Sequence, residues 1–178
     1  MKIKKRIFKV IIIFSLLFFV SAAFTFFTGY SLVLPISTNK KLYLNAEFNP
    51  GDTLAIFSKF DFTKDNWKAY LVISHDDLKD LNPAISKFTC LKTSNRKLLL
   101  RMQKSWKFKI TNGDAGTVAS DFYLYKNGIL VYKSGIILLK ISQRLQNEEF
   151  GELVPINSKE IVNTCGQFHK VYWPVVFL

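Results

Sequence analysis

The longest apolar stretch of the chain lies near its start. Thirty consecutive positions, Val10 to Asn39, carry no charged side chain, and most of them are Ile, Leu, Phe or Val. A helix of about 20 such residues crosses a bilayer core about 30 Å thick. The pattern therefore predicts a membrane-spanning helix over residues 10–34, followed by a short polar stalk over residues 35–41.

The same stretch also fits a cleaved secretory signal. Val20-Ser21-Ala22-Ala23 places small residues at the spacing that signal peptidases accept. The apolar character continues without interruption from Phe24 to Leu34, however, whereas a mature terminus usually turns polar soon after the cut. This continuation favours an uncleaved signal anchor, and the cleaved signal remains the alternative.

Beyond the stalk, apolar and polar positions alternate with the period of two that is typical of β-strands. This alternation predicts strands over residues 42–48, 54–62, 67–74, 98–102, 106–110, 117–125, 129–132, 136–141 and 171–177. Asn127-Gly128 separates two of these runs, and Asn-Gly is a strong hairpin signal because both central residues of a type I′ turn need a positive φ. Pro174 interrupts the last run, which favours an edge strand.

Helical signals in this region are short. Residues 76–81 fit a single helical turn, a short helix begins at Asn157 or Ser158, and residues 143–152 are polar and irregular. The sequence therefore predicts a mainly β fold with a minor α+β component. A membrane-spanning helix is followed by a small antiparallel β-meander, or a barrel-like domain, over residues 42–178.

The basic charge of the chain is concentrated at its start. Lys2, Lys4, Lys5, Arg6 and Lys9 precede the apolar stretch, and basic residues favour the cytoplasmic side of a first membrane span. We therefore expect a single-pass membrane protein with a cytoplasmic N-terminus and a domain on the opposite side of the membrane.

The remaining charge does not indicate nucleic-acid binding. Of the 25 basic residues, 20 follow the apolar stretch, where they face 13 acidic residues. They are spread singly through the alternating segments and form no Arg-rich stripe, which is typical of a solvated surface. We expect no direct contact with nucleic acid.

The chain has two cysteines, Cys90 and Cys165, and both follow the apolar stretch. An exported compartment permits disulfides, and an even number of cysteines fits one bridge between the middle and the end of the domain. Two buried free thiols are the alternative.

The sequence contains no recognisable catalytic or metal-binding motif. No Gly-x-Ser-x-Gly, phosphate-binding glycine loop or His-Glu-x-x-His occurs, and His75 and His169, the only histidines, have no ligand spacing with a cysteine. We expect no enzymatic activity, cofactor or metal. His75 lies beside Asp76 and is a candidate acidity switch, because histidine titrates near neutral pH.

The layout resembles a group of small bacterial inner-membrane proteins that accompany transmembrane transcription activators of the ToxR type: the FidL-like proteins, ToxS, and the PsaF and MyfF proteins. The likeness covers the helix and about the middle third of the chain. It is carried by the basic start, the single span, the segment Trp106-Lys107-Phe108-Lys109-Ile110-Thr111-Asn112-Gly113, Gly116, and the Asn127-Gly128 hairpin. The resemblance implies that this chain lies in the bacterial inner membrane with its domain in the periplasm, where it binds and protects the periplasmic domain of a one-span regulator.

We therefore expect a membrane-anchored accessory protein that binds another membrane protein, most simply through an exposed edge strand. The candidate edge comprises Val171, Tyr172, Trp173, Val175 and Phe177. A ligand carrier or sensor with a lipocalin-like cavity for a small apolar ligand is one alternative, and its candidate lining residues are Phe108, Phe122 and Tyr125. A structural component of a pilus, secretion or conjugation apparatus is another.

Overall fold

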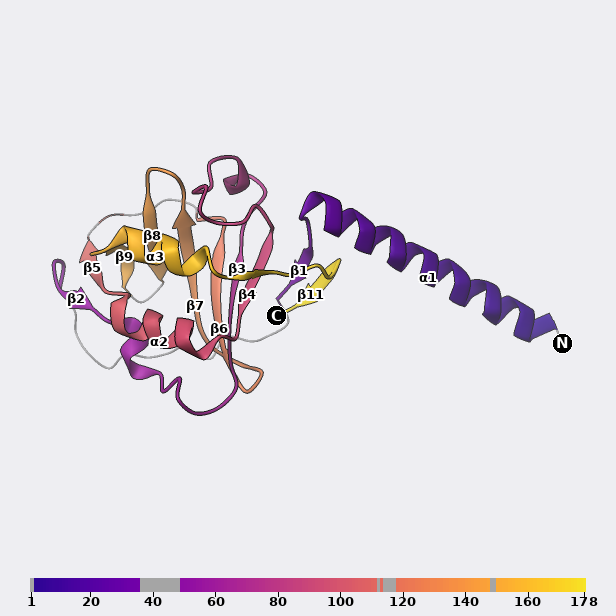
Figure 1. Cartoon of the computed structure of the whole chain (residues 1–178), viewed down its shortest axis with the longest axis horizontal. Coiled ribbons are helices and arrows are strands. Elements are labelled where there is room, and N and C mark those ends of the chain that lie inside the picture. Colours follow the sequence, from indigo (N-terminus) through magenta and orange to yellow (C-terminus); the bar gives the residue numbers. More distant parts are fainter. Residues whose placement is uncertain (1, 36–48, 112, 114–117, 148–149) are drawn as a thin grey trace.

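The computed structural model of the chain describes residues 2–35, 49–111, 113, 118–147 and 150–178. A long N-terminal helix projects away from a domain that is built on a β-sheet (Figure 1). The predicted strand at residues 42–48 and all of the predicted stalk except Pro35 lie outside the described residues.

The N-terminal helix, α1, runs from Lys2 to Thr28. Its segment Arg6–Thr28, 23 residues whose most apolar 18-residue stretch has a mean hydropathy of 2.6, is long and apolar enough to cross a membrane, and a signal sequence has the same properties. The helix ends at Gly29, whose φ of +77° is the left-handed conformation that glycine adopts at helix C-termini. It therefore stops six residues before the predicted boundary at residue 34, and Leu32–Leu34 form strand β1 instead.

The domain contains a nine-stranded sheet in which all neighbouring strands are antiparallel. Its spatial order is β10 (His169–Lys170), β4 (Cys90–Thr93), β3 (Trp67–Val72), β6 (Asp121–Lys126), β7 (Ile129–Leu138), β8 (Gln143–Asn147), β9 (Gly151–Pro155), β5 (Phe108–Thr111) and β2 (Thr53–Leu54). The consecutive strands β6 to β9 form a meander, of which only β6 and β7 lie where the sequence predicts strands. The sheet is not closed into a barrel, because β10 and β2 are its two edges.

The predicted hairpin between β6 and β7 is confirmed. Asn127 and Gly128 have φ values of 52° and 82°, which is the backbone that a type I′ turn requires. The Asn127 backbone N–H and side-chain carbonyl both bond Asn66, at 2.8 and 2.9 Å. The turn is therefore fixed both by its own geometry and by the start of the neighbouring strand β3.

The prediction of a strand around Leu98 is wrong, because this segment forms helix α2 (Arg96–Ser105). Leu98, Leu99 and Met102 are buried together, which is the spacing of one helix face. The Asn95 side chain accepts hydrogen bonds from the backbone N–H groups of the next turn and caps the helix. Three consecutive leucines satisfy both a strand and a helix pattern, and the cap decides between them.

Two further predictions need correction. The strand predicted over residues 54–62 is only β2, followed by the 3₁₀ helix η1 (Ile56–Lys59), in which the adjacent Ile56 and Phe57 are both buried. The segment predicted as irregular at residues 143–152 contains β8 and the start of β9. Its strands carry polar side chains on one face of the sheet, where Arg144 of β8 bonds Glu152 of β9.

The short helical predictions are confirmed. The turn expected at residues 76–81 is the 3₁₀ helix η2 (Asp77–Lys79), and the late helix is α3 (Ser158–Cys165), which Asn157 caps through its side chain. Arg101 of α2 bonds Glu160 of α3 through two guanidinium nitrogens, so the two helices are joined.

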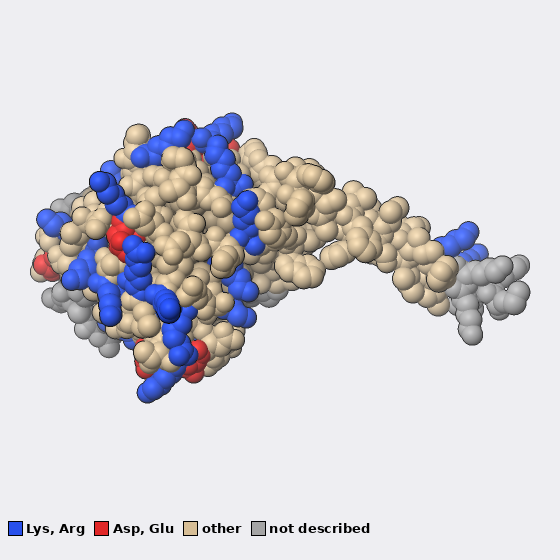
Figure 2. Space-filling model, in the orientation of Figure 1, with Lys and Arg blue, Asp and Glu red and all other residues tan. Residues whose placement is uncertain are grey.

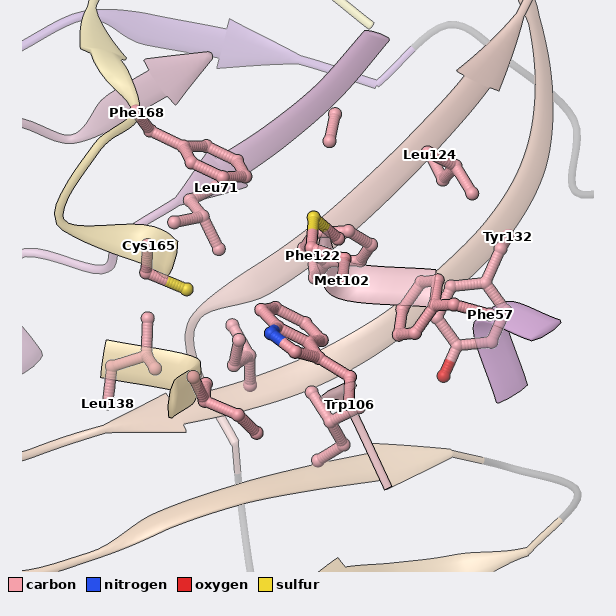
Figure 3. Close-up of a cluster of buried hydrophobic side chains, with 14 of the residues drawn as sticks. Phe57, Leu71, Met102, Trp106, Phe122, Leu124, Tyr132, Leu138, Cys165 and Phe168 are labelled. Atoms are coloured by element: carbon pink, nitrogen blue, oxygen red, sulfur yellow. The ribbon is translucent and has the colours of Figure 1, made fainter. Parts of the chain in front are cut away.

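The main core lies between one face of the sheet and the segments η1, α2 and α3, and we call this the core face. Its centre is aromatic (Figure 3). The Phe57 ring lies 5.3 Å from that of Trp106, 5.6 Å from that of Phe122 and 5.5 Å from that of Tyr132, mostly edge to face. Such rings add geometric specificity to the area they bury.

The opposite face of the sheet, the outer face, carries a second and smaller cluster. Tyr123, Tyr125 and Leu130 of β6 and β7 are buried there together with Leu178. The cover is a separate two-stranded parallel sheet of β1 and β11 (Val175–Phe177), which joins the segment after α1 to the C-terminal segment. The domain thus has three layers.

A buried carboxylate lies at the far end of the sheet from α1. Glu152 of β9 accepts hydrogen bonds from Arg144 of β8 and, at 2.5 Å, from the Thr111 hydroxyl of β5. These bonds, that from Thr111 foremost, hold the pKa of the Glu152 carboxyl below its usual value of 4.5.

We expect Phe57→Ala to lower the free energy of unfolding by about 3 to 5 kcal/mol, because Phe57 is fully buried among three other rings and the cavity cannot collapse. Urea denaturation of the full chain in detergent micelles measures it. Ile141→Ala is the matched control, since Ile141 is 96% exposed and its truncation should change stability by less than about 0.5 kcal/mol. Equal losses in both variants would contradict this assignment of the core.

We expect Glu152→Gln to destabilise the domain by about 1 to 3 kcal/mol at neutral pH, because a charge-assisted bond is lost. The folded pKa lies below 4.5, so the stabilisation is present above that pH and disappears as the pH falls through the folded pKa. Urea titrations should therefore give different free energies of unfolding for wild type and variant at neutral pH, and similar values at acidic pH. Asp76→Asn, at an exposed carboxylate, is the control, and a constant gap at all pH values would contradict the prediction.

Candidate functional site at the junction of helix and domain

The chain leaves α1 through a hydrogen-bonded junction with the domain. The Thr89 backbone N–H donates to the Gly29 carbonyl at 3.0 Å, and the Ser31 N–H donates to the Thr89 hydroxyl at 2.7 Å. A side chain at Gly29 would meet the Lys87 carbonyl at 2.8 Å, so only glycine fits there. The first residues after the helix are therefore part of the domain.

Directly after this junction, β1 pairs in parallel with β11, with Leu32 opposite Val175 and Leu34 opposite Phe177. The Leu32 N–H donates to the Pro174 carbonyl at 2.8 Å, and the Leu178 N–H donates to that of Leu34 at 3.0 Å. These bonds extend the pairing at both ends.

The two faces of this small sheet differ. Val33 and Val176 point inward and pack on the outer-face cluster. The side chains of the other face are solvent-exposed although they are apolar, and we call them the apolar patch: Leu32 (58% exposed), Leu34 (39%), Val175 (39%) and Phe177 (64%). A contiguous apolar surface of this kind marks a site of interaction with protein or membrane.

The segment that leads into β11 lies against the membrane-length helix. The Tyr172 ring is 5.4 Å from that of Phe26, and the Trp173 ring is 6.2 Å from that of Phe18. Tyr172 also packs edge to face on Phe88, at 5.3 Å. The C-terminal segment therefore follows α1 along its side as well as its end (Figure 1).

An open groove of about 360 Å³ borders the same segment. It is lined by Lys92, Ser94, His169, Lys170, Val171, Tyr172 and Trp173. The Lys170 ammonium lies 4.7 Å above the Phe88 ring, and the Lys92 ammonium lies 5.7 Å above the Tyr70 ring. The groove thus joins cationic groups to aromatic rings, and we call it the basic–aromatic groove.

The surface charge changes abruptly at this junction. Figure 2 shows Lys and Arg side chains around the domain, including the side nearest α1, whereas the surface of the helix is uncharged until its basic end. Such a boundary between charged and apolar surface is typical of a membrane–water interface.

The predicted partner-binding edge is only partly a strand. Within residues 171–177, only Val175–Phe177 is β-structure, and β1 occupies one side of it. Tyr172 and Trp173 precede it in an extended segment against α1. Sequence reasoning did not identify Leu32 and Leu34 as part of a binding surface. The signal that could have found them is the uncharged run, which continues beyond the length of one membrane span.

The predicted acidity switch, His75, also lies near the junction. It is exposed in the segment after β3, and its ring is 5.1 Å from that of Tyr30, the second residue after α1. Its role in acidity sensing stays a prediction.

The three residues predicted to line one cavity do not lie together. Phe108 and Phe122 are fully buried on the core face, at 6.3 and 5.7 Å from the Trp106 ring. Tyr125 is on the outer face, because its strand alternates between the two sides of the sheet. Phe108 and Phe122 therefore fill the core and share no cavity with Tyr125.

The predicted disulfide is not formed, because Cys90 and Cys165 are free, buried thiols. Cys90 is directly opposite Val72 on the neighbouring strand, so its side chain shares the outer face with Val72. Cys165 lies in the main core, near Leu71 on the other side of the sheet (Figure 3). A bridge would have to pass through the sheet.

Burial raises the pKa of both thiols, that of Cys90 to about 12. They are therefore protonated at neutral pH and poor nucleophiles. Among the residues that the structure describes, no group of three or more His, Cys, Asp or Glu side chains is placed to hold a metal ion.

Comparisons with protein-family models, with curated proteins and with solved structures found no match to this chain. The resemblance to the accessory proteins of ToxR-type regulators therefore stays a prediction.

We expect two free thiols in protein isolated without reductant, because the sheet separates Cys90 from Cys165. Alkylation with a maleimide polymer should add two labels in denaturant and none under native conditions, since both thiols are buried. A sample reduced beforehand gives the two-label reference. Absence of labelling in the unreduced, denatured protein would show that the disulfide between Cys90 and Cys165 is formed.

Proposed function

We propose that this chain is a non-enzymatic accessory protein that α1 holds in a membrane and that binds another membrane protein through the apolar patch. The partner class that fits best is a one-span transcription regulator of the ToxR type, whose domain lies on the same side of the membrane. The proposal assigns the N-terminus to the cytoplasm, because the basic cluster precedes the span.

The apolar patch is the observation that carries the proposal. Leu32, Leu34, Val175 and Phe177 form one exposed surface although the same strands bury their alternate side chains. Full burial of an exposed Val, Leu or Phe side chain contributes about 1.5 to 3 kcal/mol, so covering these side chains, which are 39 to 64% exposed, contributes roughly half of that each before the costs of association. A few apolar anchors of this kind account for most of the affinity of a typical interface.

The short connection between α1 and β1 supports a position of this patch close to the membrane surface when α1 spans the bilayer. Only Gly29 to Ser31 separate α1 from β1, and hydrogen bonds with Thr89 tie them to the domain. The patch cannot move far from the end of the helix. A partner in the same membrane therefore meets it at a high effective concentration, which compensates for a small interface.

Photo-crosslinking in native membranes tests the proposal. A photoreactive amino acid at Phe177 or Leu34 should yield one adduct with a protein that contains a membrane span and a DNA-binding domain, identified by mass spectrometry. Ile156, 54% exposed and located between β9 and α3, is the matched control position and should give no such adduct.

Two outcomes would contradict the proposal. Adducts only with pilus or secretion subunits would indicate a structural role in an export apparatus. A mature chain that begins near Phe24 and remains soluble would show that α1 is a cleaved signal, and the membrane tether would be lost.

A further inference from the structure

We propose that the basic–aromatic groove binds an anionic phospholipid of the leaflet nearest the domain, with the lysines on its phosphate and Trp173 among its acyl chains. This inference rests on the proposed function in one respect: α1 must span the bilayer. The occupant is assigned from the charge of the groove and from its continuity with the helix.

The residues of the groove contact α1 in the same sequence in which the headgroup and acyl chains of a lipid are arranged across a leaflet. Tyr172 contacts Phe26, about half a turn from the end of α1 at Thr28, whereas Trp173 contacts Phe18, nearly three turns from that end. Ten residues of helix correspond to about 15 Å, half the thickness of a bilayer core. When α1 spans the membrane, Trp173 is therefore at acyl-chain depth and Tyr172 is close to the interface.

The cationic groups lie at the end of the groove away from Trp173. Lys170 and His169 form β10, the edge strand, and Lys92 is directly across from His169 on β4. None of the seven described residues that line the groove is acidic. Lysines at this level favour anionic headgroups, and each contributes about a fivefold increase in lipid affinity.

The aromatic contacts hold the lysines in place. The ammonium of Lys170 lies over the Phe88 ring, which also packs on Tyr172, and that of Lys92 lies over Tyr70. The cationic and apolar parts of the groove are thus connected through Phe88. A molecule with an anionic head and an apolar tail matches both parts at once.

The three tryptophans make the inference directly measurable. Trp173 is 64% exposed, whereas Trp67 and Trp106 are buried inside the domain. Bromine on lipid acyl chains quenches tryptophan fluorescence only at short range. We therefore expect quenching of the full chain in bilayers, and loss of most of this quenching in Trp173→Phe.

The lipid preference is tested in nanodiscs with equal parts of phosphatidylglycerol and phosphatidylcholine, of which only one is brominated. Brominated phosphatidylglycerol should quench Trp173 several-fold more than brominated phosphatidylcholine. The double variant Lys92→Gln/Lys170→Gln should remove this difference. Lys107→Gln/Lys159→Gln, at two exposed lysines outside the groove, is the matched control and should retain it.

Three outcomes would overturn the inference. Equal quenching by both lipids would show no headgroup recognition, and loss of the preference on addition of inorganic phosphate would indicate a site for free phosphate. Absence of quenching, together with a crosslink from position 173 to a protein, would show that the groove binds the protein partner and not a lipid.

A carbonate wash of vesicles that carry the full chain distinguishes failure of the proposed function from failure of the lipid site alone. Release of the chain shows that α1 is no anchor, and both proposals then fail. Retention without quenching of Trp173 overturns only the lipid site.

Discussion

The parallel pairing of β1 with β11 is the constraint on which the part of the structure next to α1 depends. It joins the segment after α1 to the last strand, where the paired Leu32 and Val175 are 143 positions apart, so its loop-closure entropy is unfavourable. The burial of Val33, Val176 and Leu178 on the outer face compensates for this cost. Because β1 follows α1 after three residues, the same pairing fixes how the helix leaves the domain and where the apolar patch lies.

The sheet separates the buried side chains of the domain into two clusters, one on each of its faces. Its core face is filled by an aromatic cluster in which rings such as Phe57 and Trp106 contact one another directly. Its outer face is covered by the small sheet from the chain ends. Both faces are occupied, so both proposals place their ligand on surfaces beside α1: the apolar patch and the basic–aromatic groove.

Local signals with one physical solution were predictable from the sequence. The Asn127-Gly128 turn needs two positive φ values, and the helix at Asn157 begins at a side chain that caps it. Signals with two solutions were not predictable. The leucines around Leu98 fit a strand as well as a helix, and the polar strands β8 and β9 carry a buried charge on Glu152 that alternation cannot anticipate.

The sequence by itself determined that a membrane-length apolar helix precedes an antiparallel sheet domain, because hydrophobic length and period-two alternation are properties of neighbouring residues. Only the tertiary structure decided that Cys90 and Cys165 lie on opposite faces, that Leu32 shares a surface with Phe177, and that Trp173 lies beside the helix. Each of these depends on the register between distant strands, and a shift of one residue exchanges the two faces of a strand.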